Sequence, residues 1–146
     1  MKKTKWHNKN FFQAMKYALN GIKYVYETQR NIIIQSIFAI LAIICGILFQ
    51  INKYEWIILT IAIFFVIVAE FFNTAIETAV DLCTEEINEK AKNAKDVAAG
   101  AVLLVSFCSV IVGLIIFLPH LIAIFFIWIK YFVSIFAILQ IICKML

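Results

Sequence analysis

Four long apolar runs limit what this chain can fold into more than any other feature of its sequence. They cover residues 32–49, 56–80, 97–118 and 121–143. About 20 mainly apolar residues suffice for a helix to cross a bilayer, where a helix satisfies its own backbone polar groups. The mean hydropathy of +0.97 over 146 residues excludes a soluble globule. The runs therefore predict an all-α polytopic membrane protein.

We expect three spans, at about residues 32–50, 56–80 and 97–118, within a membrane domain formed by residues 1–119. Pro119 is expected to end the third span, because proline lacks a backbone donor and obstructs the preceding turn. Residues 120–146 form an extra hydrophobic segment, which we predict to be a fourth, C-terminal span. Its Lys130 would cost about 2.5–3.5 kcal/mol at the bilayer centre, unless it finds an acidic partner or the segment lies partly in the interface.

The basic residues indicate the orientation of the chain. Residues 1–31 contain seven lysines and arginines against a single acid, Glu27. Because loops rich in lysine and arginine stay in the cytoplasm, the N-terminus is expected there. Two crossings then return residues 81–96 to the cytoplasmic side. The predicted location is the plasma membrane, with several spans.

The segment before the first span has the pattern of an amphipathic helix. Apolar side chains recur on one side of residues 11–26, and Gln13, Lys16, Asn20 and Lys23 occupy the other. Such a helix lies in the membrane surface with its lysines near anionic headgroups. We therefore predict a cytoplasmic surface helix within residues 1–30. A helix packed against a soluble partner is the alternative.

The second span carries a polar stripe near its cytoplasmic end. Glu70, Asn73, Glu77 and Asp81 recur at helical spacing and so share one side of the helix. Ionisable residues inside an apolar span are costly and usually face a functional site. The stripe therefore predicts a site at the cytoplasmic interface.

The residue types of this stripe suit phosphoryl transfer, which needs positioning, charge neutralisation and a group that takes the proton of the attacking hydroxyl. Glu77, nearer the cytoplasm, is the natural ligand for Mg²⁺, which prefers oxygen. Glu70 lies about two turns deeper, within reach of a lipid hydroxyl, and is the candidate general base. Asn73 lies between them and supports either carboxylate. Lys95, just before the third span, is suited to phosphate oxygens.

Two other interpretations explain part of this pattern. The carboxylates could be packing or assembly residues held by hydrogen bonds, or they could line an ion or proton pathway. The ion pathway accounts less well for the adjacent Lys95 and Asp96 and for the polar segment before them.

These residues also form motifs that resemble a known family. The motifs are EFFNTAIE at residues 70–77, DL at 81–82, TEE at 84–86 and AKDVAAGAVL at 94–103. In order and spacing they resemble the small integral-membrane diacylglycerol kinases of prokaryotes, and more closely the Gram-positive branch of undecaprenol kinases. The resemblance covers about residues 10–119.

The resemblance implies an ATP- and Mg²⁺-dependent lipid kinase that assembles as a homotrimer, with sites between subunits. It implies Glu70 as the catalytic base, Glu77 as a metal ligand and Asn73 as a supporting residue. The residues implied to bind ATP are Tyr17, Glu86, Ile87, Asn88, Lys95 and Asp96.

One position departs from the family pattern. Where the family has a second metal-binding glutamate, this chain has Gln29, which is followed by Arg30 and Asn31 as in the family. Glutamine keeps an oxygen ligand but loses the charge. We therefore predict weaker metal binding at Gln29 than in the family.

The sequence thus predicts transfer of the γ-phosphate of ATP to a membrane lipid alcohol, most readily undecaprenol. Diacylglycerol is the alternative acceptor. A catalytically weak membrane assembly or ion-handling protein is the alternative from another class, because of Gln29. We expect no nucleic-acid partner.

Overall fold

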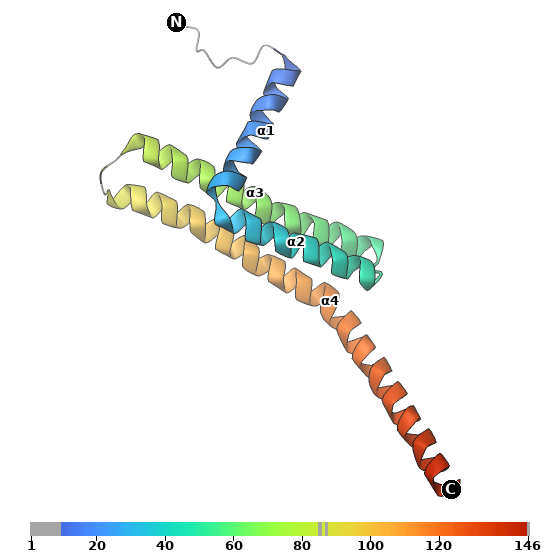
Figure 1. Cartoon of the computed structure of the whole chain (residues 1–146). Coiled ribbons are helices and arrows are strands. Elements are labelled where there is room, and N and C mark those ends of the chain that lie inside the picture. The colour runs from blue at the N-terminus through green and yellow to red at the C-terminus, as the bar shows by residue number, and fades with distance from the viewer. Residues whose placement is uncertain (1–9, 85, 87, 146) are drawn as a thin grey trace, which may run out of the picture.

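The computed structural model describes residues 10–84, 86 and 88–145, and it consists of four helices (Figure 1). They are α1 (Phe11–Thr28), α2 (Arg30–Leu48), α3 (Lys53–Cys83) and α4 (Glu89–Met145), and no strand occurs in the described residues. Three of them, α2, α3 and α4 as far as Phe136, are long and apolar enough to cross a membrane. The predicted all-α polytopic membrane protein is confirmed.

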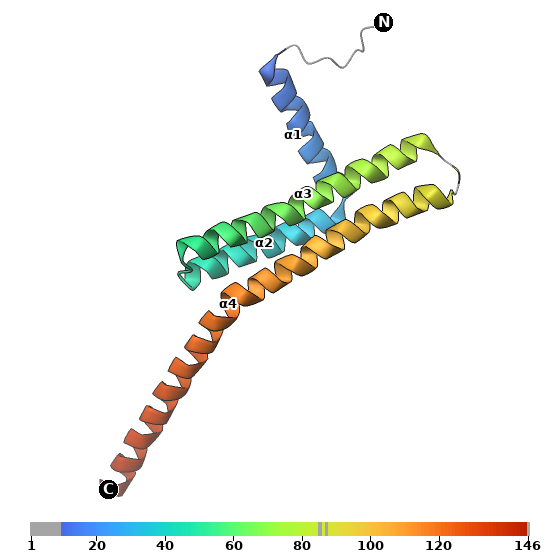
Figure 2. The ribbon, with the colours of Figure 1, turned by 180° about the vertical axis from the view of Figure 1, so that it is seen from behind.

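Helix α1 leaves the bundle at a steep angle, as Figures 1 and 2 show. It ends at Thr28, and Gln29 has an extended backbone (φ −110°, ψ 116°) that turns the chain into α2. The hydroxyl groups of Tyr26 and Ser36 lie 2.8 Å apart and join the two helices beyond this turn. Within α1 only Val25 is buried. A helix set across the bundle in this way suits the predicted position at the membrane surface, which remains a prediction.

Helices α2 and α3 form a tight hairpin. Asn52 Oδ1 accepts the N–H groups of Tyr54 and Glu55, and the Glu55 carboxylate accepts the Asn52 N–H at 2.7 Å. This reciprocal capping box satisfies donors that would otherwise be orphaned at the start of α3. Gly46 of α2 allows the close approach, because a Cβ there would lie 2.9 Å from the Trp56 ring.

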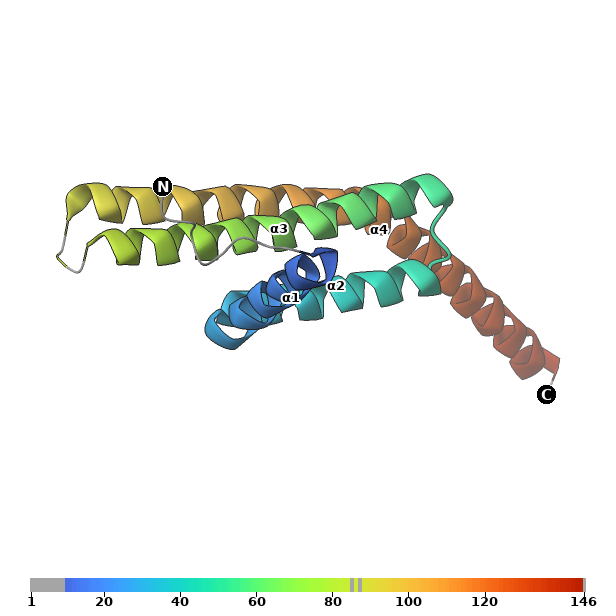
Figure 3. The same cartoon turned by 90° about the horizontal axis from the view of Figure 1, so that it is seen from above.

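Helices α3 and α4 run side by side in opposite directions over most of the length of α3, with α2 against them (Figures 1 and 3). A small apolar core of Ile51, Leu59 and Ile116 lies between the three helices, near the α2–α3 turn. Most other apolar side chains of α2, α3 and α4 point outward. Lipid tails are as apolar as these side chains, so the outward surface suits a bilayer.

Helix α4 does not end at Pro119, contrary to the sequence expectation. It begins at Glu89 and continues through Pro119 to Met145, and Figure 1 shows it bending away from the bundle beyond the α4 label. A proline in a helix removes one backbone hydrogen bond and crowds the preceding turn, which produces a kink and need not end the helix. Residues 120–145 are therefore the distal part of α4, and their crossing of the membrane stays a prediction.

Candidate active site

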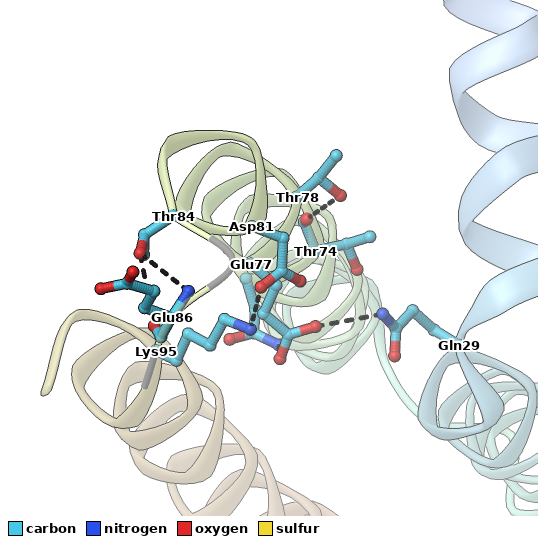
Figure 4. Close-up of polar contacts among 9 residues, drawn as sticks. Gln29, Thr74, Glu77, Thr78, Asp81, Thr84, Glu86 and Lys95 are labelled. Atoms are coloured by element: carbon cyan, nitrogen blue, oxygen red, sulfur yellow. Dashed lines mark hydrogen bonds and ion pairs between the residues drawn. The ribbon is translucent and has the colours of Figure 1, made fainter. Parts of the chain in front are cut away.

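Two glutamines of the α1–α2 segment meet two glutamates of α3. Gln29 Nε2 donates to Glu77 Oε2 at 3.2 Å, and Gln35 Nε2 donates to Glu70 Oε2 at 3.4 Å. Figure 4 shows the first of these contacts. Because α2 and α3 run in opposite directions, the earlier glutamine meets the later glutamate, and the later glutamine meets the earlier one. The hairpin thus places one amide beside each carboxylate.

Glu77 receives an N–H group at each of its carboxylate oxygens. Asn73 Nδ2, one turn earlier on α3, donates to Glu77 Oε1 at 2.9 Å, and Gln29 donates to the other oxygen. Hydrogen bonds to a charged acceptor are stronger than neutral ones. The two amides therefore fix the orientation of the Glu77 carboxylate. The role of Asn73 as a supporting residue in catalysis stays a prediction.

Glu70 lies deeper, with only 1% of its surface exposed. Within the described part of the chain, three buried side-chain oxygens lack a hydrogen-bond partner: Glu70 Oε1, Gln35 Oε1 and Asn73 Oδ1. Leaving such a group unsatisfied costs about 1–3 kcal/mol. The site therefore holds a concentration of acceptor oxygens that a hydroxyl donor or a cation would stabilise.

Lys95 of α4 pairs with Asp81 of α3 across the end of the α3–α4 hairpin (Figure 4). Asp81 follows Glu77 by one helical turn and lies on the same side of α3. Among the described residues, this ion pair is the only side-chain polar contact between α3 and the first turns of α4. It lies at the predicted cytoplasmic end of the polar stripe. Each of the four residues of that stripe has a polar side-chain partner: Gln35 for Glu70, Glu77 for Asn73, Gln29 for Glu77 and Lys95 for Asp81.

Three of the other residues with an implied ATP role, Glu86, Asn88 and Asp96, lie in or just after the segment that joins α3 to α4. Asn88 Oδ1 accepts the Lys90 N–H at 2.8 Å and caps α4, and the exposed Glu86 is held by its backbone to the Thr84 hydroxyl. Asp96 is exposed at the start of α4. Ile87 lies outside the described residues. Tyr17 is exposed on α1, and among the described residues no hydrogen bond or ion pair joins it to the cluster.

Gln35 was not predicted from the sequence as a site residue. The signal was present, because a glutamine within an apolar run is unusual in the same way as Glu70. Only the packing of α2 on α3 shows that the two residues meet.

Gln35 also lines a cavity of about 300 Å³ between α2, α3 and α4. The cavity is otherwise almost entirely apolar, and its polar lining residues besides Gln35 are Ser106 and Ser109. The Ser109 hydroxyl donates to the Ala62 carbonyl at 3.3 Å, which leaves little polarity facing the space. A hydrocarbon chain is the kind of occupant that such a lining favours.

The oxygen atoms near Glu77 fit a Mg²⁺ ion that arrives with phosphate groups. Among the described residues, no group of three or more histidine, cysteine, aspartate or glutamate side chains could hold a metal alone. Mg²⁺, however, usually binds one or two carboxylates together with substrate phosphates and water. Glu77 would supply the carboxylate, and the amides of Gln29 and Asn73 would supply further oxygens, one of them the unpaired Asn73 Oδ1.

The comparison with known proteins identifies the family. The family model described as prokaryotic diacylglycerol kinase matches residues 16–117. The undecaprenol kinase of Bacillus subtilis strain 168 is 41% identical over 111 residues, which cover 76% of this chain and 90% of that protein. The diacylglycerol kinase of Synechocystis sp. PCC 6803 is 35% identical over 84% of this chain and 71% of its own length.

A more distant relative is the diacylglycerol kinase of Escherichia coli K12, with 24% identity over 74% of this chain and 88% of that protein. The region that the family model matches, residues 16–117, includes the site residues Gln29, Gln35, Glu70, Glu77, Asp81 and Lys95. With its apolar helices, its polar site on α3 and this match over more than two thirds of its length, the chain belongs to the prokaryotic diacylglycerol kinase family and is a membrane lipid kinase.

Proposed function

We propose that this protein transfers the γ-phosphate of ATP to undecaprenol, in a reaction that requires Mg²⁺. The observation that carries the proposal is the buried Glu70 carboxylate, whose Oε1 has no partner within the described chain. It is held by Gln35, which also lines an apolar cavity. The similarity to the undecaprenol kinase of Bacillus subtilis, which covers 90% of that protein, favours undecaprenol over other lipid alcohols.

Glu70 is proposed to act as the general base. The hydroxyl of the lipid donates its hydrogen bond to Glu70 Oε1, the oxygen that the protein leaves unpaired. The hydroxyl oxygen then attacks the γ-phosphorus of ATP, the bond from that phosphorus to the β–γ bridging oxygen breaks, and ADP leaves. The proton of the hydroxyl passes to Glu70. General base catalysis of this kind contributes about 10²–10⁴-fold in rate.

Glu77 and Gln29 are proposed to hold Mg²⁺ with the phosphates of ATP, supported by Asn73. When bound, the ion neutralises phosphate charge and orients the γ-phosphate toward the acceptor. The amides of Asn73 and Gln29 keep the Glu77 carboxylate in one orientation, at 2.9 and 3.2 Å. The remaining residues proposed to contact ATP are Tyr17, Glu86, Ile87, Asn88, Lys95 and Asp96.

The proposed assembly is a homotrimer in the plasma membrane with its active site on the cytoplasmic side. The basic N-terminal residues support this orientation through the positive-inside rule. One feature of the single chain supports an assembly: the exposed Tyr17 has no hydrogen bond or ion pair with the cluster among the described residues. A neighbouring subunit would complete the nucleotide site.

Diacylglycerol is the second candidate acceptor, favoured by the 35% identity to the Synechocystis protein. The apolar cavity suits the hydrocarbon chains of either lipid. The two acceptors therefore have to be separated by experiment.

The test uses the purified full-length protein in detergent, labelled ATP and Mg²⁺, with undecaprenol and diacylglycerol offered separately. We expect labelled undecaprenyl phosphate from the wild type and loss of most activity in Glu70→Gln. The exposed Glu27→Gln is the matched control for removal of one carboxylate. If only diacylglycerol becomes labelled, diacylglycerol replaces undecaprenol as the proposed acceptor. Full activity of Glu70→Gln would refute the assignment of Glu70 as the general base.

A further inference from the structure

We propose that Gln35 is the positioning residue that orients the Glu70 carboxylate for the lipid hydroxyl. The inference rests on the proposed role of Glu70 as the general base. It concerns a residue of α2, six positions after Gln29, that acts through Glu70 and not on the nucleotide.

Gln35 is the partner on which Glu70 depends. Within the described chain, the one side-chain hydrogen bond to the Glu70 carboxylate comes from Gln35 Nε2, at 3.4 Å from Oε2. The Thr74 hydroxyl is close by, but it donates to the backbone carbonyl of Glu70 at 2.9 Å. Without Gln35, the rotation of the Glu70 side chain about its last bond would have no polar restraint.

Glu77 shows the contrast. Its two carboxylate oxygens receive N–H groups from two different residues, Gln29 and Asn73. Removing either amide would leave the other in place. Glu70 has a single donor in the described chain, so its orientation responds to one substitution.

The Gln35 bond also decides which oxygen of Glu70 stays available. An amide N–H that occupies Oε2 leaves Oε1 buried and without a partner. A carboxylate of this kind presents one defined acceptor to an incoming hydroxyl. Reaction geometry is demanding, and a misplacement of about 1 Å can cost on the order of 10²-fold in rate.

The position of Gln35 relates this acceptor to the apolar cavity. Gln35 lines the cavity of about 300 Å³ between α2, α3 and α4, and it bonds to Glu70 from there. A lipid whose hydrocarbon chain lies in or beside that cavity would meet Gln35 and Glu70 with its hydroxyl end. The second unpaired oxygen, Gln35 Oε1, adds an acceptor at the same place.

The experiment measures kcat and the KM values for ATP and for lipid in Gln35→Met, Gln35→His and Gln35→Glu. Methionine keeps the length of the side chain without a donor, and histidine restores a ring N–H. An ionised glutamate keeps the size but cannot donate to Glu70. The matched control is Gln140→Met, because Gln140 is also a helical glutamine among apolar residues but is exposed.

We expect Gln35→Met and Gln35→Glu to lower kcat by about tenfold to a hundredfold. The KM for ATP should stay close to the wild-type value, because the nucleotide residues are untouched, and Gln35→His should recover most of the lost kcat. Folding is checked by gel filtration and helical circular dichroism. If Gln35→Met does not fold, Gln35→Glu gives the same comparison with a polar side chain.

The proposal is overturned if both Gln35→Met and Gln35→Glu keep the wild-type kcat. A rise in the KM for ATP that equals the loss of kcat would also overturn it, because the residue would then act on the nucleotide site. Glu70→Gln separates this failure from failure of the proposed function. If Glu70→Gln is inactive while the Gln35 variants are normal, only the role of Gln35 is wrong. A fully active Glu70→Gln, or a wild type without kinase activity, overturns both.

Discussion

Lys95, near the start of α4, forms an ion pair with Asp81, near the end of α3. Their side chains are 37% and 64% exposed, and exposed ion pairs contribute about 0–1 kcal/mol to stability. The pair therefore adds little to the free energy of unfolding. Its consequence is positional, because it holds a lysine ammonium group one helical turn from the Glu77 carboxylate on α3.

Lys95→Met should weaken ATP binding without unfolding the protein. A hydrogen bond to a charged group contributes about 1.5–3 kcal/mol, and about 1.4 kcal/mol corresponds to a factor of ten in affinity. We expect the KM for ATP to rise about tenfold or more, measured at saturating lipid. Lys92→Met, an exposed lysine one turn away, is the control and should behave like the wild type. An unchanged KM for ATP in Lys95→Met would remove Lys95 from the nucleotide site.

Gln29→Glu should lower the Mg²⁺ concentration that gives half-maximal activity. The substitution places a second negative charge opposite Glu77, which Gln29 now contacts through an amide at 3.2 Å. Ligand charge strongly tunes the affinity of a cation site, and we expect a shift of about tenfold. Gln140→Glu adds the same charge at an exposed position on α4 and should not change the Mg²⁺ dependence. An identical dependence in Gln29→Glu and the wild type would contradict the proposed role of Gln29.

Gly46→Ala should destabilise the α2–α3 hairpin. Its Cβ would lie 2.9 Å from the Trp56 ring and 3.1 Å from Ile51 Cδ1, so these side chains or the helices must shift. Forcing extra volume into a packed site costs about 1–3 kcal/mol. The control is Gly113→Ala on α4, where a Cβ meets nothing within 4 Å. Thermal unfolding in detergent should show a lower Tm for Gly46→Ala alone; equal values for the two variants would show that the contact with Trp56 is loose.

Ending the chain after His120 should leave phosphate transfer unchanged. Residues 121–136 are all exposed. At the α2–α3 turn, by contrast, the His120 ring stacks on Phe49, and the Phe117 ring packs against Phe49 at a tilt of 57°. The control is a chain that ends after Ile115, which also loses the core residue Ile116. Removing a large core side chain costs about 2–5 kcal/mol, so this shorter chain should show a lower Tm. Loss of activity in the chain that ends after His120 would give the distal part of α4 a role in the site.

Much of the candidate site could be predicted from α3 alone. Glu70, Asn73, Glu77 and Asp81 belong to one helix, and helical periodicity fixes which side they share. The contact from Asn73 to Glu77 follows from their spacing of four residues. The partners from other helices, Gln35 above all, could not be predicted, because periodicity does not state which face of α2 packs against α3.

Pro119 shows the same limit in the fold. Proline disfavours a helix interior on local grounds, and the sequence therefore predicted the end of a span there. In the structure α4 continues to Met145, because the apolar residues on both sides favour helix and the lost hydrogen bond is only one of many. Local preference is overridden where the flanking segments keep the helix intact.

The sequence by itself determined the membrane-spanning helices, their polar stripe and the family, since apolar length, helical spacing and motif order are properties of the chain. The tertiary structure decided which groups meet: Gln29 with Glu77, Gln35 with Glu70, and Asp81 with Lys95. These pairs join residues 14 to 48 positions apart. The physical reason is that such contacts depend on the register and rotation of packed helices, which the order of residues along a single helix does not contain.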